Sequence, residues 1–244
     1  HEPMYAAFVK ASYRVDVPEQ LPRLLRQCFR EAASGPVRPV HLDVAGNTGS
    51  VTDFAELVFD QTVEREYATV PAQRPAGDAG QIEKAAKAIA AAERPVIIAG
   101  AGAIMSGAEK ALRTFAEKAG IPLVAALDAK AVLTDDHPLY GGIVGTYSCH
   151  CANKLVAEAD LAIFVGSDTG DQVTNNFTLP RPGATVIQID IDPTELGRNF
   201  GGAIGIHADP RTAIEQLAAV VDQKTRPEWQ ARLAQLVAEW RAYI

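Results

Sequence analysis

The stretch that decides the fold is VIIAGAGAIMSGAE, residues Val96–Glu109. An apolar run leads into three glycines, Gly100, Gly102 and Gly107, and a helical pattern follows. This order predicts a buried strand, a glycine turn and a helix. Because backbone amides at such a turn can bind a phosphate, the stretch raises the question of whether it holds a dinucleotide or is only a tight turn.

The glycine spacing matches a dinucleotide fingerprint only in part. It reads G-x-G-x-x-x-x-G instead of G-x-G-x-x-G, and Asp128, the next acidic residue after a strand, lies later than the fingerprint requires. Ser106 and Glu109 form a capping-box pattern at the start of the expected helix. Two interpretations stay open: a nucleotide site, or a turn whose glycines supply positive φ angles.

Strands and helices alternate after this stretch, and the strands are continuous apolar runs, which indicates a parallel sheet covered on both faces. We expect a three-layer α/β/α, Rossmann-like domain with a mostly parallel sheet over residues 81–222. Asp209 is the expected cap of one helix. The expected strands are 95–99, 121–126, 139–144, 161–165, 185–191 and 203–207, and the expected helices are 81–92, 106–119, 149–159 and 209–221.

The flanking regions are less regular. Residues 1–46 contain a helical pattern at 16–34 and a strand pattern at 37–44, which together are too little to bury a core. Residues 47–80 are rich in turn signals and are expected to be a linker. Residues 223–244 predict a further helix with an apolar stripe, which consists of Trp229, Leu233, Leu236, Val237 and Trp240. This stripe needs a surface to pack on, either in this domain or in a segment after Ile244.

Composition narrows the class of function. The net charge is −7 and the pI is about 5.3, with no basic block, so nucleic acid is not an expected partner. No apolar run is long enough to span a membrane, and no signal peptide is visible, so a cytoplasmic location is expected. Three cysteines do not indicate a disulfide framework. Cys149-His150-Cys151 resembles a metal tract but lacks a second ligand pair, so no metal site is expected.

Two more turns follow apolar strands, at Val165–Asp171 (VGSDTGD) and at Asp190–Thr194 (DIDPT). In a parallel sheet they share one edge with the glycine turn, and ligands of open α/β sheets bind at that edge. The plainer alternative is that Asp192 caps the turn that follows and Asp171 serves a loop. No G-x-S-x-G elbow and no Ser, His and acid set is present, so no catalytic residue is expected in this chain.

Several segments, in the same order, resemble the acetolactate synthase-like branch of thiamine diphosphate-dependent enzymes. Those that resemble the central domain of these enzymes are Glu93–Ala108, Asp135–Gly145, Ala159–Phe177 and Ala184–Phe200. Residues 17–46 resemble the end of the pyrimidine-binding domain, with Ala45 in place of the usual proline. The chain does not begin with Met, which agrees with a piece of a longer protein.

The resemblance implies a fragment of a 2-oxoacid decarboxylase or carboligase with a structural and subunit-interface role. The full-length enzyme would use thiamine diphosphate and Mg, and would be a homodimer or homotetramer. The activating glutamate and the Gly-Asp-Gly…Asn motif of the family are not found in this chain. We therefore expect the chain alone not to catalyse, and its partners to be the missing pyrimidine- and pyrophosphate-binding domains.

In flavin-containing members the central domain binds FAD in a structural role, so the resemblance implies a site for FAD or another adenine nucleotide. Asp168 and Gln172 replace arginines of the family pattern, and an acid near a diphosphate is unfavourable. A CoA-like ligand or an empty site are the alternatives. The site residues carried over by motif are Gly100, Ala101, Gly102, Gly145, Tyr147, Ser148, Gly166, Ser167, Asp168, Asp190, Ile191 and Asp192.

Two other functions compete with this hypothesis. One is a free-standing nucleotide-binding module of the flavoprotein electron-carrier type. The helix and strand of residues 1–46 do not fit such a module, whereas they fit the remnant of a second domain. A sirtuin-like deacylase would need four zinc-binding cysteines, and the chain has three.

Overall fold

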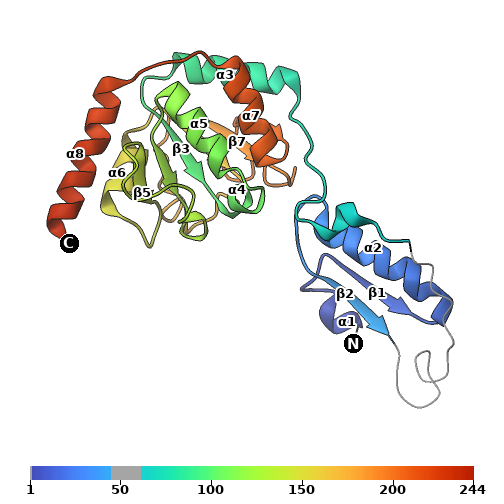
Figure 1. Cartoon of the computed structure of the whole chain (residues 1–244). Coiled ribbons are helices and arrows are strands. Elements are labelled where there is room, and N and C mark those ends of the chain that lie inside the picture. The colour runs from blue at the N-terminus through green and yellow to red at the C-terminus, as the bar shows by residue number, and fades with distance from the viewer. Residues whose placement is uncertain (1, 45–61) are drawn as a thin grey trace. The chain divides into compact units, whose positions relative to one another are not determined.

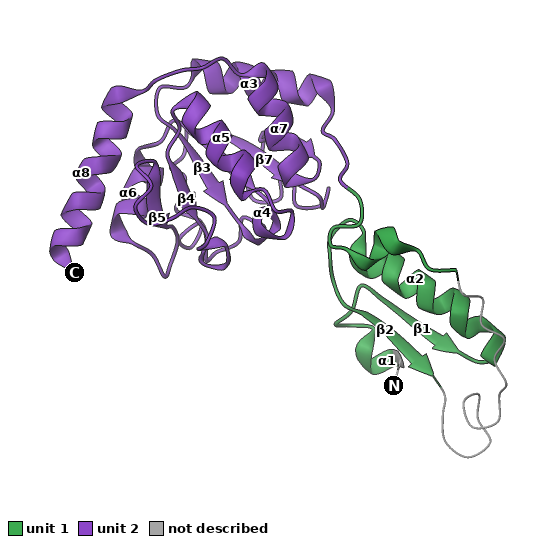
Figure 2. Cartoon of the chain, viewed as in Figure 1, with its two compact units in different colours: residues 1–73 green, residues 74–244 purple. Residues whose placement is uncertain are grey.

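The computed structural model describes residues 2–44 and 62–244. The chain divides into two compact units, residues 1–73 and residues 74–244, called here the smaller and the larger unit (Figures 1 and 2). The turn signals at 46–53, Ala45 and the predicted linker up to residue 61 lie outside the described residues.

The smaller unit is built on two parallel strands, β1 (Ala11–Val15) and β2 (Val40–Val44), in continuous register. Helix α2 (Leu21–Ala33) packs on both strands. The helix and β2 were expected, but β1 was not, because ASYRV has little apolar pattern and is a strand through its pairing with β2. The other elements are α1 (Glu2–Tyr5) and short 3-10 turns at Pro18–Gln20 and Arg65–Ala68.

The larger unit contains six parallel strands in the order β5-β4-β3-β6-β7-β8, which confirms the expected parallel α/β fold. Strands β3, β4 and β5 follow one another toward one edge of the sheet, and β6, β7 and β8 follow one another toward the other edge. The topological switch point therefore lies between β3 and β6. The strands are β3 (Pro95–Ala99), β4 (Leu123–Ala125), β5 (Tyr140–Ile143), β6 (Leu161–Val165), β7 (Thr185–Asp190) and β8 (Ile204–His207).

Helices cover both faces of this sheet (Figure 1). Ile97 of β3 belongs to the core under one group of helices, whereas its neighbours Val96 and Ile98 belong to the core under the other group. Alternate residues of a strand point to opposite faces, so this division produces three layers. The first group is α3 (Ala79–Ala91), α5 (Glu109–Ala119) and α7 (Pro210–Val220), and the second is α6 (His150–Glu158) and α8 (Pro227–Tyr243).

The helix expected at residues 106–119 is α5, which begins three residues later than expected, at Glu109. A short helix that was not expected, α4 (Ala101–Met105), precedes it, and Gly107, whose φ is +65°, lies between the two. The capping-box prediction is wrong, because Ala108 is the N-cap residue of α5 and makes no side-chain bond. The Ser106 hydroxyl instead donates to Asp209 over 2.8 Å. Asp209 accepts from the Thr212 amide over 3.0 Å, which confirms it as the cap of α7.

The apolar stripe of α8 finds its docking surface within the larger unit. Trp229, Leu233 and Leu236 are buried in the core of the second face, and α8 packs on α6. The Trp229 indole donates to the Pro95 carbonyl over 2.8 Å, which ties the start of α8 to the start of β3. No helix in the part of the chain that the structure describes is long and apolar enough to cross a membrane.

Candidate functional site

The turns that follow β3 and β6 touch each other at the switch point. The Gly102 amide donates to the Gly166 carbonyl over 2.9 Å. A Cβ at Gly100 would lie 2.4 Å from the Gly166 oxygen, and one at Gly102 would lie 2.8 Å from the Gly166 Cα. Gly100 has φ −110°, so what requires glycine there is the close approach of two backbones and not a positive φ.

Three backbone amides of the glycine turn are already paired within the chain. Gly100 donates to the Val165 carbonyl and Ala103 to the Gly100 carbonyl, each over 3.0 Å, and Gly102 donates to Gly166 as described above. The backbone of Ala101 lowers the pKa of Asp128, which follows β4, so this carboxylate lies near the turn. A phosphate at this turn would therefore meet paired amides and a nearby negative charge.

The Asp128 and Asp168 carboxylates lie near each other. Burial raises the pKa of Asp128 above its usual value, and the negative charge of Asp168 adds to that rise. Asp168 itself accepts from the Gly170 amide over 3.1 Å. The Arg198 guanidinium donates to the Asp168 carbonyl over 2.5 Å and to Glu195 over 2.7 Å, so this cation is already engaged.

Gly145, after β5, meets the loop that follows β6. A Cβ at Gly145 would lie 2.0 Å from the Gln172 carbonyl oxygen, and its φ is +113°, so only glycine fits. The Asn153 side chain bonds both the amide and the carbonyl of Gly145, over 2.8 and 2.9 Å. Gly145 is buried, whereas Tyr147 and Ser148, the two site residues predicted beside it, are 71% exposed and half-buried, respectively.

The third turn begins at the end of β7. Asp190 accepts from the Asp192 amide over 2.9 Å, and the Ile191 carbonyl contacts the His207 ring over 3.0 Å. Asp192 accepts from the Thr194 amide over 3.0 Å, which confirms its predicted capping role. The Ile189 carbonyl accepts from the Gly166 amide over 2.8 Å, so all three predicted turns lie along one edge of the sheet.

Burial raises the pKa of Asp190 to about 6, from 3.8 in its unperturbed state. The folded protein therefore holds this proton more tightly than the unfolded chain, and the resulting stability is complete below pH 3.8 and is lost as the pH rises through 6. We expect Asp190→Asn to raise the free energy of unfolding by about 2–3 kcal/mol at pH 8 and by almost nothing at pH 4. Urea titrations at the two pH values measure this; an equal gain at both would contradict it.

Three residues at this edge were missed by sequence reasoning. Gln188, only 2% exposed, accepts from the Gly197 amide over 2.6 Å and donates to the Glu195 carbonyl over 3.2 Å. Asn199 donates to the Thr169 carbonyl over 2.9 Å, and Arg198 contacts Asp168. A lone glutamine inside the apolar run of β7 was a visible signal, since a buried polar side chain needs partners.

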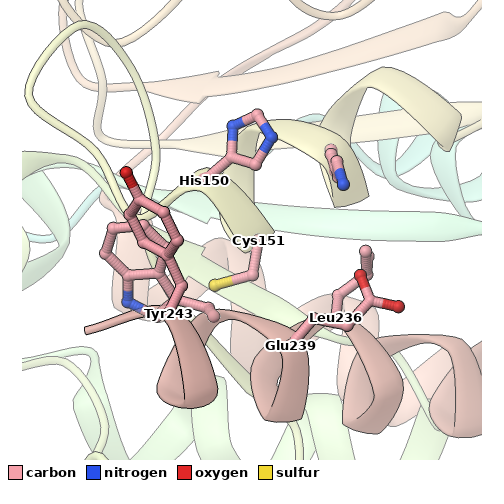
Figure 3. Close-up of a pocket in the computed structure, with 7 residues that line it drawn as sticks. His150, Cys151, Leu236, Glu239 and Tyr243 are labelled. Carbon is pink, nitrogen blue, oxygen red and sulfur yellow. The ribbon is translucent and has the colours of Figure 1, made fainter.

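The tract Cys149-His150-Cys151 lies at the start of α6, beside a pocket of about 530 Å³ between α6 and α8 (Figure 3). The His150 ring and the Cys151 sulfur point in different directions (Figure 3). Within residues 2–44 and 62–244 no group of three His, Cys, Asp or Glu side chains is arranged to hold a metal ion.

Comparison with known proteins agrees with this architecture. A probable acetolactate synthase large subunit of Methanocaldococcus jannaschii is 34% identical over 96% of this chain and 40% of its own length. Glyoxylate carboligase of Escherichia coli O157:H7 is 32% identical over 86% of this chain and 36% of its own length. The chain thus spans well under half of these curated relatives.

Solved structures show the same fold. Benzoylformate decarboxylase from Polynucleobacter necessarius superposes with a TM-score of 0.73 at 24% identity, over 91% of this chain and 40% of that one. The profile of the family described as thiamine pyrophosphate enzyme, central domain, matches residues 82–217. Because this match takes in more than half of the chain, the chain belongs to the family of thiamine pyrophosphate enzyme central domains.

Proposed function

We propose that this chain forms the central part of a thiamine diphosphate-dependent carboligase of 2-oxoacids, and that it acts there as a scaffold and a subunit interface. The observation that carries the proposal is the family match over residues 82–217 on a six-stranded parallel sheet. Similarity to an acetolactate synthase large subunit covers 96% of the chain and so extends over the smaller unit as well. One of the two curated relatives is named a carboligase of glyoxylate, and the other a probable synthase of acetolactate.

Thiamine diphosphate would supply the carbanion that such an enzyme uses to form a carbon–carbon bond. The described residues bring no three metal-ligating side chains together for the metal that accompanies the diphosphate of this cofactor. The proposal therefore assigns both groups to the pyrimidine- and pyrophosphate-binding domains of the complete enzyme, and gives this chain no step in the chemistry.

The experiment is to express the protein from its complete reading frame and to supply thiamine diphosphate and Mg²⁺ with pyruvate, alone and with glyoxylate. We expect release of CO₂ together with a coupled product, and no turnover by the 244-residue chain under the same conditions. A complete protein that loads thiamine diphosphate but forms no product from either acid would contradict carboligation.

The FAD or adenine nucleotide that the resemblance implies stays a prediction, and the geometry opposes it. Three amides of the glycine turn are paired within the chain, and the Asp128 carboxylate lies near that turn, with Asp168 close enough to raise its pKa. Like charges a few ångströms apart repel by about 1 kcal/mol or more. We infer that these two carboxylates keep a dinucleotide diphosphate away from the turn.

A titration of the chain with FAD, followed by flavin fluorescence anisotropy, tests this inference. We expect binding weaker than about 1 mM, and an affinity at least about tenfold higher in the double variant Asp128→Asn/Asp168→Asn, because two repulsive charges are removed. Micromolar binding by the unaltered chain would overturn the inference and support the FAD or adenine nucleotide site that the resemblance implies.

A further inference from the structure

Two cysteines at the start of α6 lie against the same two residues of β5. The Cys151 thiol donates to the Gly141 carbonyl over 3.3 Å. A Cβ at Gly142 would lie 3.0 Å from the Cys149 sulfur. Since Gly141 and Gly142 are consecutive, the two sulfurs lie close to adjacent residues of β5.

Chain geometry keeps the pair within bridging reach. Residues two positions apart have Cα atoms at most about 7 Å apart, which overlaps the range found across disulfides. Cys149 is also among the neighbours that raise the pKa of Cys151, so the two thiols lie near each other. Gly142 has φ +88°, and the absence of a side chain there leaves room for the Cys149 sulfur.

The two thiols differ in accessibility. Cys149 is half-buried, whereas Cys151 is 4% exposed. Burial raises the pKa of Cys151 to about 11, so this residue stays a protonated thiol near neutral pH. A reachable thiol next to a protected one is the arrangement of a peroxide-reactive cysteine and its resolving partner.

We propose that Cys149 and Cys151 form a redox pair that closes to an intramolecular disulfide when the protein meets a peroxide. The peroxide oxidises the Cys149 thiol to a sulfenic acid, and one water leaves. The Cys151 thiol then loses its proton as its sulfur attacks the Cys149 sulfur; the S–S bond forms, the S–O bond breaks, and the departing hydroxide takes that proton and leaves as a second water. Two thiols are oxidised, and one hydrogen peroxide is reduced to two waters.

The surroundings of Cys151 allow this movement. Its side chain lines the pocket of about 530 Å³ between α6 and α8, with Leu236 and Tyr243 on the α8 side (Figure 3). The Cys151 side chain therefore borders space that packed side chains do not fill. Closure exchanges one weak S–H···O bond for a covalent bond.

The test is to treat the reduced chain with hydrogen peroxide and to count free thiols after denaturation. We expect the three thiols to fall to one, with a loss of about 2 Da in the peptide that spans residues 149–151 and recovery on addition of dithiothreitol. Cys28→Ser should undergo the same loss. Cys149→Ser and Cys151→Ser should not form the intramolecular bond.

Two results would overturn the proposal. One is Cys149 oxidised to sulfinic or sulfonic acid while Cys151 remains a free thiol. The other is a disulfide that links two chains through Cys28. Circular dichroism of each variant checks folding, and Cys149→Ser, at the half-buried position, keeps the test valid if Cys151→Ser misfolds.

Discussion

Replacing Gly100 with alanine is expected to lower the free energy of unfolding of the larger unit by more than about 3 kcal/mol. The new Cβ would lie 2.4 Å from the Gly166 carbonyl oxygen and 2.7 Å from the Ser167 Cα. Both are backbone atoms, so neither can rotate away. To relieve this steric clash, β3 and β6 would have to separate, and this would disrupt a pairing of five residues.

Gly201→Ala is the matched control for that substitution. No atom lies within 4 Å of the position of its Cβ, and its φ is not positive. We expect a change within about 0.5 kcal/mol, as for other exposed sites. Urea denaturation followed by circular dichroism measures both variants. Equal midpoints for Gly100→Ala and Gly201→Ala would show that the contact between the two turns is not tight.

Arg226→Met is expected to cost about 3 kcal/mol or more. The Arg226 side chain is buried, and its guanidinium donates to the carbonyls of Ala119, Ile89 and Ala92. These carbonyls lie at the carboxyl ends of α5 and α3, where the helix dipole favours a positive charge. Methionine has similar length but no donor, so it would leave buried carbonyl groups without partners at about 1–3 kcal/mol each.

Arg211→Met is the matched control. It removes a positive charge in the same way but leaves no buried carbonyl without its donor. Arg211 forms an exposed pair with Glu215 at 2.9 Å on α7. Such pairs contribute about 0.5 kcal/mol or less, so this variant should unfold close to the parent. Thermal unfolding of the two variants side by side provides the comparison. A similar small loss in both would mean that the carbonyls at the helix ends find other donors when Arg226 is absent.

Much of the larger unit could be predicted from local patterns. The six expected strands and the helices after residue 80 are present; the differences are the later start of the helix expected at 106–119 and the additional short helix α4. Continuous apolar runs report burial on both faces of a strand, and 3.6-residue spacing reports one buried helix face. These are properties of neighbouring residues, so they can be read along the chain.

The candidate site was predictable in its location but not in its contacts. That three turns share one edge follows from parallel strands. That Arg198 and Gln188 hold the Asp168–Thr169 turn does not, because those partners lie in other loops. The sequence likewise offered no way to see that Asp128 lies near the backbone of Ala101.

By itself, the sequence determined the fold class and the position of VIIAGAGAIMSGAE as a strand, a turn and helical residues, because local periodicity is enough to set burial. Only the tertiary structure decided what the glycines are for. Gly100 and Gly102 make room for Gly166, more than sixty residues later, and Ser106 bonds Asp209 instead of capping its own helix. Contacts between distant segments depend on which strands become neighbours, and that order emerges only when the whole sheet assembles.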